Sequence, residues 1–125
     1  MRQATLAALA AVVWVTSVVP AVAQDAVKVD PKHYKVEFEN DQVRVLRITY
    51  EHGEKSVMHE HPASMAVFLT DGQVKFTLAD GKTQDANVKA GSTMWEPAGK
   101  HLPENVGKAR FELILVELKG KPAPK

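Results

Sequence analysis

The sequence contains no cysteine. This absence excludes disulfide bonds, thiolate metal ligands, cysteine nucleophiles and a lipidated N-terminal cysteine. Charge of one sign is not in excess either, because 16 Lys and Arg residues balance 15 Asp and Glu residues to a net charge of +1. Since the lysines are also scattered along the chain, no nucleic-acid partner is expected. The sequence also lacks a Ser-His-Asp order and a glycine-rich phosphate loop.

Long apolar runs are confined to the N-terminus. Residues 1–23 begin with a charge at Arg2, continue through an apolar run from Leu6 to Val19 and end in Ala21-Val22-Ala23. This order predicts a signal peptide cleaved after Ala23, and therefore a periplasmic or secreted protein with no membrane association after cleavage. The apolar run is shorter than the roughly 20 residues that span a membrane. An uncleaved anchor helix is the alternative.

The rest of the chain has little helical periodicity, since no 11-residue window after Ala23 repeats apolar residues at helical spacing. Glycines instead divide it into short segments, and Asp71-Gly72 and Asp80-Gly81 are pairs typical of hairpin turns. We expect eight or nine strands in a sandwich or barrel. Predicted strands cover residues 42–51, 65–70, 74–78 and 111–118, and the last is apolar enough to be central. The length of 125 residues fits a single domain.

Three of the five histidines carry most of the chemistry. His59 and His61 are two residues apart, so on a strand their side chains would project from the same face. Imidazoles at that spacing can share a metal ion. His101 lies about 40 residues later, where a returning strand would place it opposite the pair. Taken alone, a His-x-His pair is equally compatible with two exposed side chains on an edge strand.

The spacing around these histidines resembles the two motifs of the cupin family. The first is Gly53-x5-His59-x-His61-x3-Met65-x6-Gly72, and the second is Gly91-x5-Pro97-x-Gly99-x-His101-x3-Asn105. The two motifs stand in the expected order, separated by 18 residues. The resemblance covers most of the chain that follows the predicted signal peptide.

The resemblance implies an all-β fold, the double-stranded β-helix or jelly-roll barrel of cupins, often as a homodimer. The resemblance places the cupin domain at residues 41–119. From their composition, we expect residues 24–40 to be a lead-in and edge strand and the Pro- and Lys-rich residues 120–125 to be a disordered tail. By the same resemblance, a metal ion would bind in the barrel mouth to His59, His61 and His101. Gly53, Gly72, Gly91 and Gly99 would be turn residues, and Pro97 would set the turn that leads into the strand of His101. The second motif has one residue between Gly99 and His101 where two are commoner.

Met65 occupies the place of the usual glutamate ligand of the first motif. Three neutral histidines leave a divalent ion with a charge near +2, and nitrogen-only ligation suits Zn²⁺, Fe²⁺, Ni²⁺ or Cu²⁺ rather than Mn²⁺ or Mg²⁺. An open position beside three histidines is typical of a catalytic site. Met65 could add a thioether ligand, which would favour copper, or it could simply fill space in the core.

Three functions remain open at this point: a metal-dependent enzyme of the dioxygenase or isomerase kind acting on a small molecule, a non-enzymatic binder of copper or a small molecule, and a cupin that uses only the fold. Other polar residues near the motifs are expected at the surface, with an acid–base role as the alternative, namely Glu60, Glu96 and Glu104. Tyr50 is expected in the core, although its hydroxyl could reach the barrel mouth. His33 and His52 are expected to be solvated. Met94 and Trp95 are expected in the core, with pocket lining as the alternative.

Overall fold

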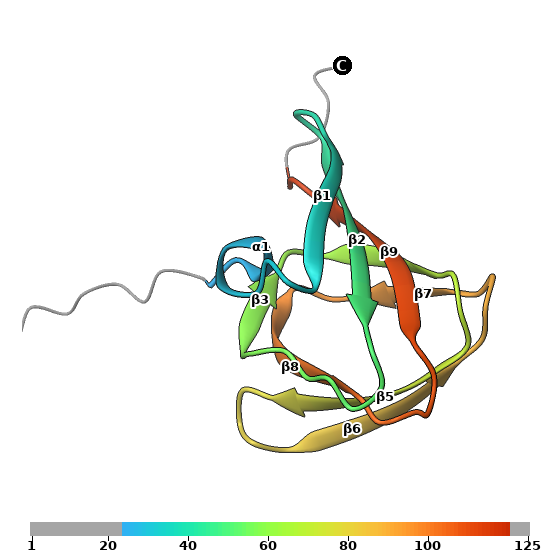
Figure 1. Ribbon diagram of the computed structural model, residues 1–125. Coiled ribbons are helices and arrows are strands. Elements are labelled where there is room, and N and C mark those ends of the chain that lie inside the picture. The colour runs from blue at the N-terminus through green and yellow to red at the C-terminus, as the bar shows by residue number, and fades with distance from the viewer. Residues whose placement is uncertain (1–23, 121–125) are drawn as a thin grey trace, which may run out of the picture.

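Strand β9 (Phe111–Leu118) is the middle strand of a five-stranded antiparallel sheet in the order β1-β2-β9-β4-β7. This computed structural model describes residues 24–120 of the chain (Figure 1). The prediction that residues 111–118 form a central strand is confirmed. Every second side chain of β9 is buried, beginning with Phe111 and ending with Glu117, because successive residues of a strand point to opposite faces.

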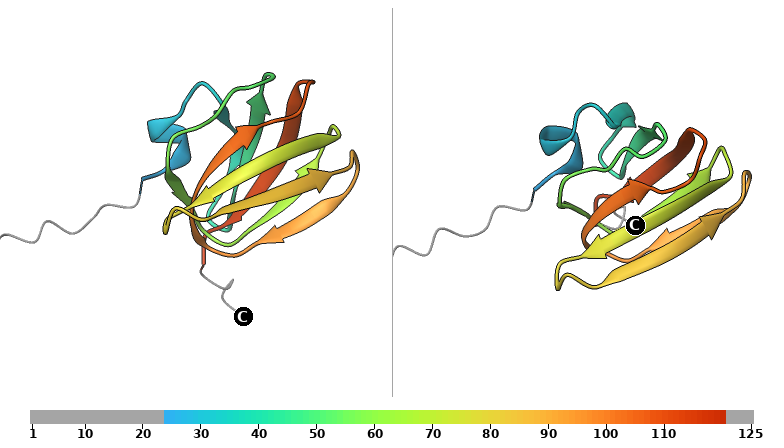
Figure 2. Two further views of the ribbon diagram at one scale, coloured as in Figure 1. Left: turned by 90° about the horizontal axis from the view of Figure 1, so that it is seen from below. Right: turned by 60° about the horizontal axis from the view of Figure 1, so that its bottom comes forward.

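Two sheets face each other and enclose the core (Figure 2). The five-stranded sheet contains β1 (Tyr34–Glu39), β2 (Val43–Tyr50), β9, β4 (Ser64–Phe68) and β7 (Thr93–Glu96). The four-stranded sheet has the order β3-β8-β5-β6, formed by β3 (His59–His61), β8 (Gly99–Asn105), β5 (Gly72–Leu78) and β6 (Thr83–Val88). Nine strands within residues 24–120 confirm the expected all-β jelly roll.

The core lies between the sheets and draws on both. In β2, Leu46, Ile48 and Tyr50 are buried, whereas Arg47 and Thr49 face the other side, as their alternation predicts. The remaining buried apolar residues come mainly from β1, β4, β5, β6 and β9: Tyr34, Ala66, Phe68, Val74, Val88, Phe111, Leu113 and Leu115.

A single helical turn, α1 (Ala26–Val29), precedes β1 and contacts both β1 and β3. Asp25 caps it, since its carboxylate accepts a hydrogen bond from the Val27 amide. Ala26 is fully buried and anchors the turn to the barrel. Four residues are too few to show helical periodicity in the sequence. Among residues 24–120, no helix has both the length and the apolar character that crossing a membrane requires.

The glycines of the two motifs differ in role. Gly53 and Gly91 adopt positive φ angles of 75° and 81° in turns, as expected. The expectation of turns at Gly72 and Gly99 is wrong, because these residues begin β5 and β8. At Gly72 a Cβ atom would lie 2.3 Å from Cδ2 of Phe111, so close packing requires glycine there. Only the second Asp-Gly pair closes a hairpin, between β5 and β6, with Gly81 at φ 85°.

Two predictions fall outside the described residues. They are the signal peptide, at residues 1–23, and the disordered tail, of which only Gly120 is described.

Candidate metal centre

The pairing of β3 with β8 brings the three motif histidines together. His59 lies directly opposite His101 across the antiparallel pair, and His61 lies opposite Gly99. His59 and His61 project from the same face of β3, toward the barrel interior, and both are buried. Because Gly99 has no side chain, the space beside His61 stays open. The returning strand thus places His101 where the sequence predicts it.

The three imidazoles surround a common point. Their ring centroids are 4.7 Å apart for His59 and His61, 4.9 Å for His59 and His101, and 5.2 Å for His61 and His101. One ring nitrogen from each lies within 4.8 Å of the others. A tetrahedral ion bound at about 2.0–2.1 Å would bring these nitrogens to about 3.4 Å. Binding would therefore bring the nitrogens closer together by up to about 1.4 Å.

Hydrogen bonds on the far side of two rings determine which nitrogen is free. Nδ1 of His59 lies 2.8 Å from the carbonyl oxygen of Val57, and Nδ1 of His61 lies 2.6 Å from the carboxylate of Glu117. A carbonyl or a carboxylate can only accept, so both Nδ1 atoms donate and both Nε2 atoms keep their lone pairs. Within the described residues, three buried Nε2 atoms have no hydrogen-bond partner: those of His59 and His101 in the cluster, and that of His33, which lies 3.5 Å from Glu54.

Buried polar atoms without partners are rare and costly in proteins. A lone pair on imidazole Nε2, with Nδ1 donating to a fixed acceptor, is the usual arrangement of a metal-bound histidine. His59 and His61 have this arrangement, and the orphaned Nε2 atoms of His59 and His101 fit binding of a transition-metal ion.

Burial also keeps two of the rings neutral. Burial, together with the neighbouring His61, lowers the pKa of His59 to about 4. Burial, together with His59 and His61, lowers the pKa of His101 to about 3. Since metals bind the unprotonated ring, both histidines are ready to bind at neutral pH.

Glu117 is a site residue that the sequence interpretation missed. It is almost fully buried on β9, where it accepts hydrogen bonds from His61 and, at 2.6 Å, from Nε of Arg44. Burial acts to raise the pKa of Glu117, but the hydrogen bonds from His61 and Arg44 outweigh it and hold the pKa below its ordinary value. Arg44 also makes two hydrogen bonds to Asp25, so the carboxylate that orients His61 is itself held in place.

Met65 is not part of this cluster. It lies on the face of β4 opposite to the buried Ser64 and Ala66, and its side chain is 37% exposed. It therefore neither joins the histidines nor fills the core. The two residues after His61 leave the four-stranded sheet, so the alternation of faces restarts in β4.

Glu96 faces the histidines from the opposite sheet. It pairs with Ser64, so it lies on the inward side of β7. Glu96, His61, Phe76 and His101 line both a narrow cavity inside the barrel and a wider pocket of about 350 Å³ that opens between β7 and β5. No hydrogen bond or ion pair of its carboxylate occurs among residues 24–120. Burial raises the pKa of Glu96, and His61 partly opposes this.

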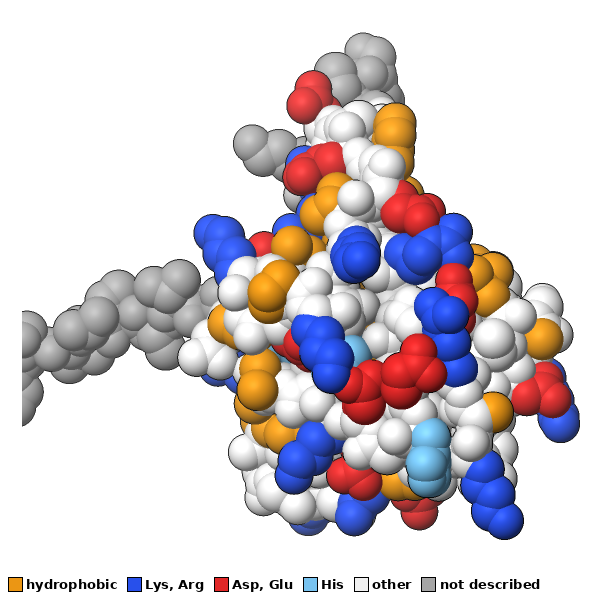
Figure 3. All heavy atoms as spheres, in the orientation of Figure 1, with side chains coloured by type: hydrophobic (Ala, Val, Ile, Leu, Met, Phe, Trp, Pro, Cys, Tyr) orange, Lys and Arg blue, Asp and Glu red, His pale blue; other side chains and the backbone are white. Residues whose placement is uncertain are grey.

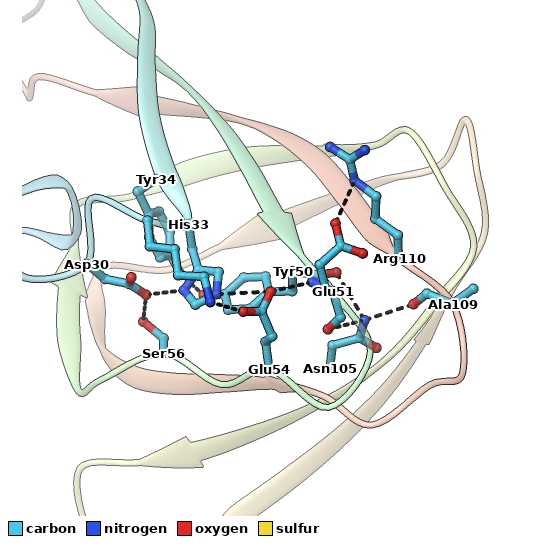
Figure 4. Close-up of polar contacts among 11 residues, drawn as sticks. Asp30, His33, Tyr34, Tyr50, Glu51, Glu54, Ser56, Asn105, Ala109 and Arg110 are labelled. Carbon is cyan, nitrogen blue, oxygen red and sulfur yellow. Dashed lines mark hydrogen bonds and ion pairs between the residues drawn. The ribbon is translucent and has the colours of Figure 1, made fainter.

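A second buried polar network is formed by Asp30, His33, Ser56 and their neighbours (Figure 4). His33 is only 6% exposed, so the expectation of a solvated His33 is wrong. Its Nδ1 lies 2.7 Å from Asp30, and its ring stacks on Tyr50. Ser56 donates to Asp30 and lies 3.2 Å from Nδ1 of His59, which links this network to the histidine cluster.

The other candidates are placed as follows. Tyr50 is a core residue, and its hydroxyl pairs with that of Tyr34. His52 is exposed, as expected. Glu60 and Glu104 are half-buried. The core placement of Met94 and Trp95 is wrong, because both side chains are exposed, although both line the outer pocket.

Comparisons with known proteins agree with the fold. The profile of the family described as Cupin domain matches residues 46–117. A cupin domain structure from Bordetella pertussis Tohama I superimposes with a TM-score of 0.65 at 21% identity, covering 70% of this chain and 92% of that one.

Two further structures are similar. One is an uncharacterized conserved protein with a double-stranded β-helix domain from Klebsiella pneumoniae (TM-score 0.57, 20% identity, 72% and 78% coverage). The other is an RmlC-like cupin family protein from Methanocaldococcus jannaschii. It superimposes with a TM-score of 0.54 at 22% identity, covering 71% of this chain and 83% of that one. At these identities they show the fold, a double-stranded β-helix. No curated protein matches the sequence significantly.

Proposed function

Because the chain belongs to the cupin domain family, we propose that it binds one divalent transition-metal ion through His59, His61 and His101 and uses it in chemistry on a small molecule. Zn²⁺, Fe²⁺, Ni²⁺ and Cu²⁺ suit the nitrogen donors. The observation that carries the proposal is the pair of buried Nε2 atoms, on His59 and His101, that have no partner among the described residues.

Such an ion, when bound, supplies a Lewis acid that polarises a ligand oxygen. The residues of the chain do the rest. The carbonyl oxygen of Val57 orients the ring of His59, and the carboxylate of Glu117 orients the ring of His61, each by accepting a hydrogen bond from the ring's Nδ1 atom. Phe76 stacks on the ring of His101 at a centroid distance of 5.3 Å and, with Leu78, forms an apolar wall on this side of the site.

Glu96 gives the site its acid–base group in this proposal. Its carboxylate faces the pocket without an internal partner, so it is free to hydrogen-bond to a ligand and to exchange a proton with it. The pocket of about 350 Å³ suits a small molecule with an apolar body, which would contact Phe76, Leu78 and Met94, and a polar group directed to the histidines. The composition of residues 1–23 supports action in the periplasm or outside the cell.

The test is metal binding by the purified protein, measured by elemental analysis and by calorimetric titration with Zn²⁺, Cu²⁺, Ni²⁺ and Fe²⁺. We expect one ion per chain, and we expect His101→Ala to weaken the affinity at least 1,000-fold. His52→Ala is the matched control, because His52 is exposed and lies outside the cluster. Absence of a stoichiometric ion, or equal affinity of the His101→Ala and wild-type proteins, would contradict the proposal.

A further inference from the structure

A hollow of about 300 Å³ lies on the outer side of β1 and β2, next to the loop that follows β2. This outer hollow shares no lining residue with the pockets beside His61 and His101. Seven of its eight lining side chains are ionisable, and basic and acidic side chains lie next to one another on the face shown in Figure 3. The lining residues are Lys32, His33, Lys35, Arg47, Thr49, Glu51, Glu54 and Arg110.

His33 lines the outer hollow with an unpartnered nitrogen, although its side chain is only 6% exposed. Its Nδ1 lies 2.7 Å from the carboxylate of Asp30, which can only accept, so Nδ1 donates and Nε2 of the neutral ring keeps its lone pair. That Nε2 has no hydrogen-bond partner among residues 24–120. Oε1 of Glu54 lies 3.5 Å away, but it is an acceptor as well, so neither atom satisfies the other (Figure 4). A ligand atom that carries hydrogens would satisfy both.

The acceptors around His33 favour an ammonium group as that donor. Lys32 pairs with Oε2 of Glu54, whereas Oε1, which faces His33, accepts a hydrogen bond only from the backbone amide of Glu51. The carboxylate of Glu51 also lines the outer hollow. An ammonium group has three N–H donors and can bond to His33 and Glu54 at once, whereas a hydroxyl group has one. Its positive charge also suits the two carboxylates.

Lys35 provides the opposite requirement in the same hollow. It lies directly across from Arg47 in the pairing of β1 with β2, and like charges in such a pair repel each other. Arg47 forms ion pairs with acidic residues, but no ion pair of Lys35 occurs among residues 24–120. His33 and Lys35 flank the buried Tyr34, and alternate residues of an extended chain are about 7 Å apart. A small molecule can therefore place an anionic group at Lys35 and a donor at His33.

We infer that the outer hollow binds a small zwitterion, an α-amino acid, with its ammonium group on His33 and Glu54 and its carboxylate on Lys35. The volume of about 300 Å³ is at the lower end for small-molecule sites, which suits a ligand of this size. Because no apolar side chain lines the hollow, amino acids with small or polar side chains are favoured. The inference does not depend on the metal site, since the two sites have no lining residue in common.

The test is calorimetric titration of the full chain with glycine and L-serine. Glycolate, which has a hydroxyl in place of the ammonium group, and ethanolamine, which lacks the carboxylate, should each bind roughly 10-fold more weakly. Lys35→Gln should weaken the binding of both amino acids by a similar factor. Lys82→Gln is the matched control, because Lys82 is exposed in the turn between β5 and β6. His101→Leu should bind L-serine as tightly as the wild type, which would exclude binding at the histidine cluster.

A second measurement reports on His33 without any substitution. In NMR spectra of nitrogen-labelled protein, the Nε2 resonance of His33 should shift when L-serine is added, because its lone pair then accepts a hydrogen bond. The Nε2 resonance of His52, which is exposed and lies outside the hollow, should stay in place. The inference would be overturned if neither amino acid bound, if glycolate bound equally well, if Lys35→Gln kept full affinity, if His101→Leu lost binding, or if the His33 resonance did not move.

Discussion

Strand β8 carries two polar residues, His101 and Asn105, that differ in how many of their hydrogen bonds are made within the protein. At its C-terminal end, the amide of Asn105 donates to the carbonyl oxygens of Tyr50, Glu51 and Ala109, and its oxygen accepts from the amide of Gly107. Four residues earlier, the buried Nε2 of His101 has no partner among residues 24–120. Figure 4 shows part of the Asn105 set.

The difference separates a polar group whose hydrogen bonds are all made within the fold from one that remains available to a ligand. A buried side chain whose hydrogen bonds are all made holds loops together and leaves nothing for a ligand. A buried lone pair without a hydrogen-bond donor destabilises the folded protein. Binding of an ion to that lone pair would remove this cost and stabilise the fold. Both residues belong to the same motif spacing, so the spacing alone does not distinguish their roles. The predictions below test that separation.

The largest expected effect on stability is at Asn105, whose hydrogen bonds are all made within the protein. Asn105→Ala should lower the free energy of unfolding by about 3 kcal/mol, because it leaves several buried backbone groups without partners. Denaturant unfolding measures this loss. Asn87→Ala, at an exposed position of β6, is the control and should change stability by less than about 0.5 kcal/mol. Metal affinity of any folded Asn105→Ala protein should match wild type, and a large loss would show that the two ends are coupled.

Glu117→Gln tests whether the carboxylate of Glu117 orients His61 for metal binding. The substitution keeps the shape but replaces one acceptor oxygen with a donor that faces His61 or Arg44. Loss of such a partner typically weakens metal affinity about 10–100-fold. Glu112→Gln is the control, since Glu112 lies on the opposite face of the same strand and pairs with Arg47. If the two variants bind metal equally well in calorimetry, Glu117 does not orient the site.

Much of this arrangement could be predicted from the sequence, because it depends on local alternation. The same-face rule places His59 with His61, and the apolar run of β9 marks the central strand. The same alternation applied to β9 would also have placed Glu117 on the inward face with Phe111 and Leu115. Its partner Arg44 is 73 residues away in sequence, however, and no local pattern reveals such a contact.

Other features depend on where the chain changes sheet. Met65 was expected to face inward from its motif position, but Pro62 and Ala63 connect strands of two different sheets, and the alternation does not carry across that connection. His33 is buried because Asp30 and Tyr50 surround it, and neither contact has a spacing signature. Face assignments therefore hold within a strand and fail between strands.

Acidification should destabilise the metal-free protein through His59 and His101. The pKa of His59, about 4, and that of His101, about 3, both lie below the ordinary value of 6.5. As pH falls below 6.5, the unfolded chain therefore binds protons before the folded protein does, and stability declines until the folded rings titrate. Between pH 7.5 and 5.5 the loss should be about 1 kcal/mol for each ring. Urea unfolding at both pH values measures this loss in the wild type and in a His59→Leu/His101→Leu protein. If the unfolding free energies of the two proteins fall equally between the two pH values, the prediction is wrong.

The smallest expected effect reverses the usual sign of a core substitution. His101→Leu replaces an unsatisfied polar ring with an apolar side chain beside Phe76 and Leu78, so the metal-free protein should gain about 1 kcal/mol of stability. The same variant should also lack the metal-dependent increase in melting temperature that we expect of the wild type. Asn105→Leu, by contrast, should destabilise the protein, since it removes four hydrogen bonds. If His101→Leu is as destabilising as Asn105→Leu, then His101 stabilises the fold in the way that Asn105 does. In that case the unpartnered nitrogen of His101 does not destabilise the metal-free protein.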